Sequence, residues 1–196
     1  MKYQTIKSNS SAIFEINKSK FLAFVFNVID IDQANELIHK YKQEYKDARH
    51  VVYAYIIGES ANQIKCSDDN EPSGTAGLPI LSLLQQKALT NVILIVVRYF
   101  GGIKLGANGL VKAYRNSAKL VLDKTEFIDL IKYYYYQIKY NLEHTNQFNH
   151  FCYINDLVII RTSYEQNSVL VYVLSKQELN QIDYKYLDCE LIKYDY

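Results

Sequence analysis

Most of the residues that could do chemistry in this chain lie in two glycine-rich segments. Six of the seven glycines and both prolines fall in the segments SDDNEPSGTAGLP (67–79) and RYFGGIKLGANG (98–109). Each segment runs directly into a helix-forming sequence, and the backbone amides at a helix N-terminus attract anions. We therefore expect the two segments to form one cleft that binds a phosphate or a carboxylate. The candidate ligands are Ser73, Gly74, Thr75, Gly77, Arg98, Gly101, Gly102, Lys104 and Gly106.

Arg98 and three nearby acids allow two interpretations. The planar guanidinium of Arg98 suits a phosphate, but pairing with Asp68, Asp69 or Glu71 is an equally physical role. The three acids lie within four residues and could serve, with His50, as acids or bases in the cleft. Acidic loops of this kind are more often solvated or paired with cations than bound to a metal, so no metal site is predicted.

A basic helix face follows the second segment. The stretch from Gln85 to Leu122 contains no acidic residue. Within it, Lys112, Arg115 and Lys119 are spaced i, i+3 and i+7, so they share one face of a helix. This face could track the phosphates of RNA, although a solvated helix face is an equally good interpretation.

No catalytic residues are predicted, and neither is a cofactor. The glycine spacing fits neither a Walker A loop nor G-x-G-x-x-G, and no Ser/His/Asp or Cys/His arrangement can be drawn. Cys66, Cys152 and Cys189 form no C-x-x-C pair, which is typical of free thiols in a reducing compartment. No apolar run approaches membrane-spanning length, so a cytoplasmic protein without membrane contact is expected.

The elements that must position these residues follow from periodicity. Apolar alternation predicts strands at 3–7, 11–17, 20–27 and 50–57, and the all-apolar run at 92–97 predicts a central strand. Helices are expected after Asp30 or Asp32, from about 75–78 to Ala88, and over about 107–122.

The sequence after residue 123 predicts a second domain. Its expected order is a strand over 128–140, a helix that buries Phe148 and Phe151, a strand pair joined by a turn at 165–167, a helix opened by Ser175 and Glu178, and a strand over 187–195. This β-α-β-β-α-β order is that of a ferredoxin-like unit. The fold class is therefore α+β, with a two-layer α/β domain over 1–125 and a ferredoxin-like domain over 126–196.

The two segments also carry a family resemblance. DDNEPSGTAGLPIL, followed by VILIVVRYFGGIKLGANGLVKAY, resembles the signature of the YigZ/Impact family, and weaker similarity includes ARHVVYAY at 48–55. The chain departs from the family pattern at four positions. These are Asn70 and Asn108 in place of glycine, Leu78 in place of arginine, and Val97 in place of threonine.

The resemblance implies a fold and a function. It implies an N-terminal domain like domain IV of elongation factor G, with a left-handed βαβ crossover, and a C-terminal domain like domain V of that factor. The family's eukaryotic members regulate translation. We therefore expect a non-enzymatic protein whose partner is RNA, the ribosome or a protein of the translation machinery. The alternatives are an enzyme acting on a small anionic substrate and a protein-interaction module.

Overall fold

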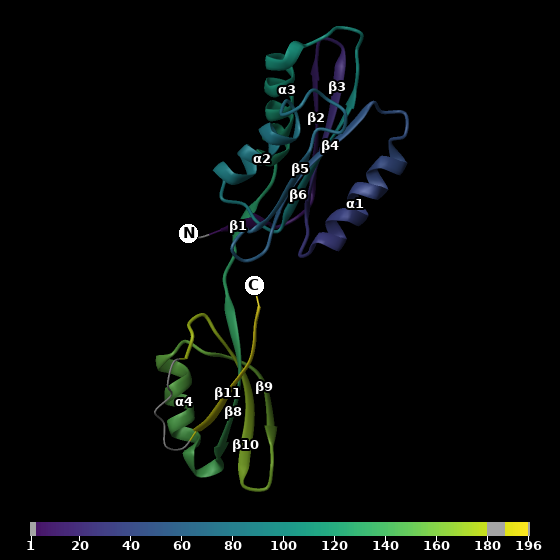
Figure 1. The fold of residues 1–196 in the computed structure, drawn as a ribbon. Coiled ribbons are helices and arrows are strands. Elements are labelled where there is room, and N and C mark those ends of the chain that lie inside the picture. The colour runs from purple at the N-terminus through teal and green to yellow at the C-terminus, as the bar shows by residue number, and fades with distance from the viewer. Residues whose placement is uncertain (1–2, 180–186, 196) are drawn as a thin grey trace. The chain divides into compact units, whose positions relative to one another are not determined.

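The chain folds into two compact units, Met1–Leu130 and Ile131–Tyr196 (Figure 1). The computed structural model describes residues 3–179 and the backbone of residues 187–195. The division between the units falls after Leu130, beyond the boundary expected near residues 124–128.

A five-stranded antiparallel sheet forms the centre of the first unit. Its order is β2-β3-β6-β4-β5, and β6 is its central strand. All six residues of the VILIVV run in β6 are buried, which explains why this strand has no polar face. The strands are β2 (Ser10–Ile16), β3 (Ser19–Asn27), β4 (His50–Ile57), β5 (Gln63–Ser67) and β6 (Val92–Tyr99).

Helices cover both faces of this sheet, so the expected two-layer arrangement is wrong. Helix α1 (Ile31–Glu44) packs on one face, where Tyr41 meets Phe24 and Phe26. Helices α2 (Gly77–Gln86) and α3 (Gly106–Leu122) pack on the other face, as Figure 1 shows. The reason lies in β3, β4 and β6, whose apolar residues alternate between the two cores and leave neither face polar.

The edge strand β5 was not expected from the sequence. Its five residues, QIKCS, are exposed or half-buried because it pairs only with β4. An edge strand of this kind lacks the apolar run that marks β4 and β6. It ends at Ser67, directly before the acidic loop that begins at Asp68.

The expected strand over 128–140 is two strands that belong to different units. Strand β7 (Phe127–Asp129) pairs with β1 (Gln4–Ile6) in a separate two-stranded sheet of the first unit. Strand β8 (Tyr133–Asn141) belongs to the second unit. Residues 126–130 therefore belong to the N-terminal unit and not to the C-terminal domain.

The second unit is an antiparallel sheet of order β11-β8-β10-β9 with helix α4 (Thr145–Ile154) packed against it. Its other strands are β9 (Val158–Tyr164), β10 (Ser168–Ser175) and β11 (Leu187–Asp195). Phe148 and Phe151 of α4 are buried in its core, as the sequence predicted. The expected helix after Ser175 and Glu178 falls mainly on residues outside the described ranges.

Candidate functional site

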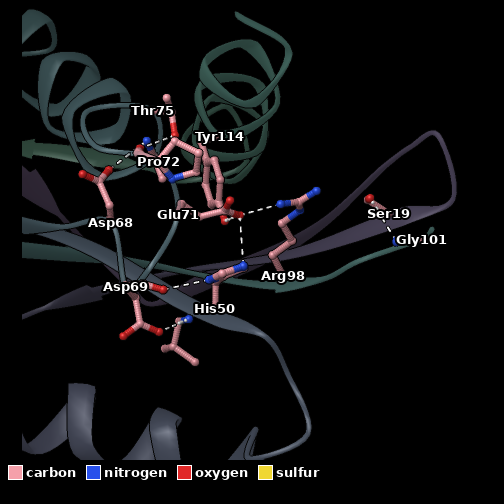
Figure 2. Close-up of polar contacts among 12 residues, drawn as sticks. Ser19, His50, Asp68, Asp69, Glu71, Pro72, Thr75, Arg98, Gly101 and Tyr114 are labelled. Carbon is pink, nitrogen blue, oxygen red and sulfur yellow. Dashed lines mark hydrogen bonds and ion pairs between the residues drawn. The ribbon is translucent and has the colours of Figure 1, made fainter. Parts of the chain in front are cut away.

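A buried carboxylate, Glu71, lies at the centre of the polar residues of the first unit. Its side chain is 3% exposed. Its Oε1 accepts hydrogen bonds from Arg98 Nη1 at 2.6 Å and from the Tyr114 hydroxyl at 2.7 Å (Figure 2). A buried carboxylate needs such partners because an unpaired charge in this environment would be costly. The sequence left two roles open for Arg98, a phosphate ligand or a partner of one of three acids, and in the structure it pairs with Glu71.

His50 is oriented by the acidic loop. Its Nδ1 lies 2.8 Å from the Asp69 carbonyl oxygen, which can only accept, so Nδ1 carries the proton. The Asp69 carboxylate accepts from the backbone N–H of Val51 at 2.7 Å and pairs with Lys42. His50 Nε2 lies 3.7 Å from Glu71 Oε1, beyond hydrogen-bond distance. No hydrogen bond within the described part of the chain engages Nε2.

The guanidinium of Arg98 lies near two aromatic rings. Its Cζ is 5.5 Å from the ring centroids of both Phe21 and Phe100. The Arg98 side chain is 6% exposed, and its buried Nε has no hydrogen-bond partner in the part of the chain that the structure describes. Burial, followed by the charge of Glu71, raises the pKa of Tyr114 well above its usual range. Tyr114 therefore remains a neutral donor to Glu71.

The amides of the SGTAG loop already bind an anion, the carboxylate of Asp68. Its Oδ2 accepts from Gly74 N at 2.8 Å, and its Oδ1 accepts from Ala76 N at 3.0 Å and Gly77 N at 2.8 Å. The Thr75 hydroxyl donates to the carbonyl of Pro72 at 2.6 Å. The expectation that these groups seat an external anion is therefore not supported by their geometry. Asp68 instead caps the N-terminus of α2.

Two of the glycines permit close backbone contacts within the fold. A Cβ on Gly101 would lie 2.0 Å from the carbonyl carbon of Lys18, and one on Gly77 would lie 2.9 Å from the backbone of Ser67. Gly102 and Gly106 have positive φ values of 83° and 71°, with no atom near the position of a Cβ. Gly101 and Gly77 are thus explained by packing, whereas Gly102 and Gly106 shape an open loop.

A pocket of about 360 Å³ lies beside Glu71 and Arg98. The segments 49–50, 70–72 and 104–107 line it, together with Arg98, Phe100 and Leu110, and the SGTAG loop does not. Its charged lining consists of Arg49, Arg98, Lys104 and Glu71. The N-terminus of α3 also lines it, and no side chain of the described residues forms a capping hydrogen bond there. The pocket therefore collects cations and helix amides around a carboxylate that Arg98 already neutralises.

The basic residues of α3 lie away from this pocket. A helix turns about 100° per residue, so Lys112 is about 200° from Tyr114, whose side chain faces Glu71. Arg115 donates to Gln86 of α2 at 2.6 Å, and Lys119 pairs with Asp123. The predicted cations therefore form two groups: Arg98 and Lys104 at the pocket, and Lys112, Arg115 and Lys119 along the outer side of α3.

Three residues of the site were not selected from the sequence. Tyr114 lies four residues after Leu110 on the buried side of α3, so its spacing indicates only a core position. Arg49 directly precedes His50, and Phe100 directly follows the end of β6, so adjacency in sequence was the available signal.

In the described part of the chain, no cluster of three or more His, Cys, Asp or Glu side chains could hold a metal. No described helix is long and apolar enough to cross a membrane.

Comparison with known proteins identifies the family. Residues 17–122, more than half of the chain, match the model of the Impact N-terminal domain. The chain belongs to the Impact family. This match confirms the resemblance carried by the two glycine-rich segments and includes every residue of the pocket.

Individual relatives agree with this identification. The IMPACT family member YvyE of Bacillus subtilis is 44% identical over 115 residues, which cover 59% of this chain and 53% of YvyE. The IMPACT family member YigZ of Escherichia coli is 39% identical over 106 residues, which cover 53% of this chain and 52% of YigZ. The match thus spans about half the length of these relatives. A crystal structure described as that of a hypothetical protein covers 89% of this chain and 85% of its own, with a TM-score of 0.65 and 28% identity.

Proposed function

We propose that this protein is a translation-associated regulator that contacts RNA or the ribosome through its N-terminal unit. Membership in the Impact family supports the regulatory part, because the resemblance implies that eukaryotic members regulate translation. The observation that carries the RNA contact is the charge of the pocket. Three cationic side chains line it against one carboxylate, and that carboxylate is bound to Arg98. An anionic backbone suits such a surface.

The outer side of α3 supplies the second part of the proposed contact. Lys112 and Lys119 are exposed there. Lys119 pairs with Asp123, but both side chains are largely exposed, and exposed ion pairs of this kind are weak. A phosphate can therefore compete with Asp123 for Lys119. The RNA would run along this helix face and interact with the pocket at one point only.

Fluorescence anisotropy of a labelled RNA at several salt concentrations tests this proposal. In the double variant Lys112→Ala/Lys119→Ala, the slope of log K against log salt should fall by about 1.4–1.8, since each phosphate contact contributes about 0.7–0.9. The matched control is Lys40→Ala/Lys46→Ala, which removes the same charge from exposed lysines at α1 and just after it. An unchanged slope in the first variant, or an equal fall in the control, would contradict the proposed RNA face.

A second candidate function is catalysis on a small anionic substrate in the pocket. The observation that favours it is the orientation of His50. Its Nδ1 proton is held by the Asp69 carbonyl, so a neutral ring offers its Nε2 lone pair beside Arg98 and Lys104. Turnover by the purified protein that is lost in His50→Gln but kept in Lys112→Ala would favour this function over RNA contact.

We also propose that the two units have the folds that the resemblance implies. In the first unit, β3 and β4 are both antiparallel to β6 and are connected through α1, which fits a split βαβ crossover of the kind proposed for elongation factor G domain IV. In the second unit, β10 lies between β8 and β9, and β11 lies on the other side of β8. This order supports a ferredoxin-like arrangement.

A further inference from the structure

The pocket beside Glu71 has the features of a site for one end of a small ligand. We propose that it binds a phosphate monoester of a nucleotide, either a free nucleoside monophosphate or, building on the proposed RNA contact, the phosphorylated end of an RNA strand. Both sources present the same chemistry, a terminal phosphate attached to a nucleoside. The charges, the Arg98 Nε that has no partner among the described residues, and the apolar lining of the pocket lead to this ligand.

The charge of the lining selects a dianion. Arg49, Arg98 and Lys104 carry three positive charges, and Glu71 carries one negative charge. Two positive charges are therefore left when His50 is neutral. A phosphate monoester carries a charge of about −1.5 to −2 at pH 7, which matches this excess. A carboxylate or an internal phosphodiester, with one negative charge, would leave a cation without a partner.

The donors that would hold the phosphate come from separate elements. The N-terminus of α3, which no described side chain caps, brings the first residues of a 17-residue helix to the pocket. His50 lies at the start of β4 and so comes from a different element than this helix. Its side chain is 8% exposed, its Nδ1 is held by Asp69, and its Nε2 makes no hydrogen bond with any described residue. The Nε of Arg98 is buried and has no hydrogen-bond partner among the described residues, and a buried polar atom in that state needs a partner. A protonated phosphate oxygen can donate to Nε2, and a protonated His50 can donate to the phosphate.

The rest of the lining suits the nucleoside. Pro72, Phe100, Leu105 and Leu110 are apolar residues that share the pocket with the cations. The Phe100 ring is 39% exposed, so part of it is open to a ligand. Aromatic side chains commonly stack with bases, and this interaction tolerates any base because each has an aromatic face. Phe100 would therefore add affinity for a nucleotide that inorganic phosphate cannot gain.

Titration calorimetry with adenosine 5′-monophosphate, adenosine and inorganic phosphate tests the proposal. The monophosphate should bind at least tenfold more tightly than adenosine or inorganic phosphate, because it alone uses both parts of the pocket. Lys104→Ala should weaken monophosphate binding about tenfold. Lys104 is exposed, so this variant should fold normally. The matched control is Lys40→Ala, an exposed lysine of α1 that does not line the pocket, which should bind as the wild type does.

Phe100→Leu tests the contribution of the nucleoside to binding separately from that of the phosphate. It should weaken binding of the monophosphate several-fold and leave binding of inorganic phosphate unchanged. The proposal is overturned if the wild type does not bind the monophosphate, if adenosine binds equally well, or if Lys40→Ala weakens binding as much as Lys104→Ala.

Two RNA octamers of one sequence, one with a 5′-phosphate and one with a 5′-hydroxyl, distinguish the two sources. Tighter binding of the phosphorylated octamer that depends on Lys104 assigns the pocket to RNA ends. Equal binding of both octamers, together with monophosphate binding, assigns it to a free nucleotide. Because the salt-slope test depends on Lys112 and Lys119, a failure of the RNA face leaves the result of the monophosphate titration unaffected.

Discussion

Three carboxylates of a single loop have three different functions. Each of them binds a different group. Asp68 accepts from backbone amides, and Asp69 accepts from the N–H of Val51 and pairs with Lys42. Glu71 accepts from Arg98 and Tyr114. Only Glu71 lines the pocket. Its position depends on partners from β6 and α3, which lie 27 and 43 residues away in sequence.

The hydroxyl of Tyr114 should contribute measurably to stability. Tyr114→Phe removes a hydrogen bond to a buried carboxylate, and bonds to charged groups contribute about 1.5–3 kcal/mol. We expect a loss of that size in the free energy of unfolding, measured by urea denaturation. The control is Tyr99→Phe, which removes a hydroxyl that bonds Asp47 at the surface and should cost less than about 0.5 kcal/mol. Equal losses would mean that the Glu71 network does not stabilise the fold.

Cys152 should make the second unit sensitive to alkaline pH. Burial raises the pKa of its thiol from 9.0 to about 11. Between these values the folded thiol keeps its proton while the unfolded chain releases it, so stability should fall as pH rises from 9 to 11. Alkylation by iodoacetamide at pH 9, followed by mass spectrometry of peptides, should modify Cys152 more slowly than the half-buried Cys66. Faster modification of Cys152 would contradict this environment.

At the scale of elements, helix α2 depends on a residue outside it. Its N-cap position, Ala76, has no side chain that can cap, and Asp68 supplies the missing acceptor from the preceding loop. Asp68→Ala should therefore cost about 2 kcal/mol or more, at the upper end of capping effects. Asp68→Asn keeps one acceptor oxygen and should cost less.

The control for this prediction is Asp30→Ala. The Asp30 carboxylate accepts from Gln33 N and is an ordinary cap of α1, so its removal should cost about 1 kcal/mol. Urea denaturation of the three variants provides the comparison. If Asp68→Ala is no more destabilising than Asp30→Ala, the loop amides have other partners in solution.

The same loop explains what the sequence could and could not predict. The strands β3, β4 and β6 and the helices α1 and α3 were predictable because their apolar periodicity is local. The partner of the SGTAG amides was not, since an internal carboxylate and an external phosphate satisfy the same amides. Gly101 likewise resembled a ligand-binding glycine, but its neighbour is the backbone of Lys18, which is distant in sequence. Contacts of this kind depend on the tertiary fold.

At the scale of the whole molecule, the boundary between the units is set by pairing and not by composition. The expected element order changes after Asp123, and no glycine or proline occurs after Gly109, yet the chain remains part of the first unit through Leu130. Strand β7 pairs with β1, and Lys7 forms an ion pair with Glu126 at 3.0 Å. A three-residue strand with one partner is too short to recognise from periodicity.

Truncation tests where the first unit ends. A chain ending at Leu130 should fold and give a dispersed ¹⁵N–¹H spectrum, because its two cores lie within residues 1–130. A chain ending at Thr125 lacks β7 and the bonds from Lys7 N to Glu126 O and from Leu130 N to Tyr3 O. At about 1 kcal/mol per lost hydrogen bond, it should be less stable by roughly 2–4 kcal/mol. Equal stability of the two chains would place the boundary at 125 after all, and an unfolded 1–130 chain would show that the first unit needs the second.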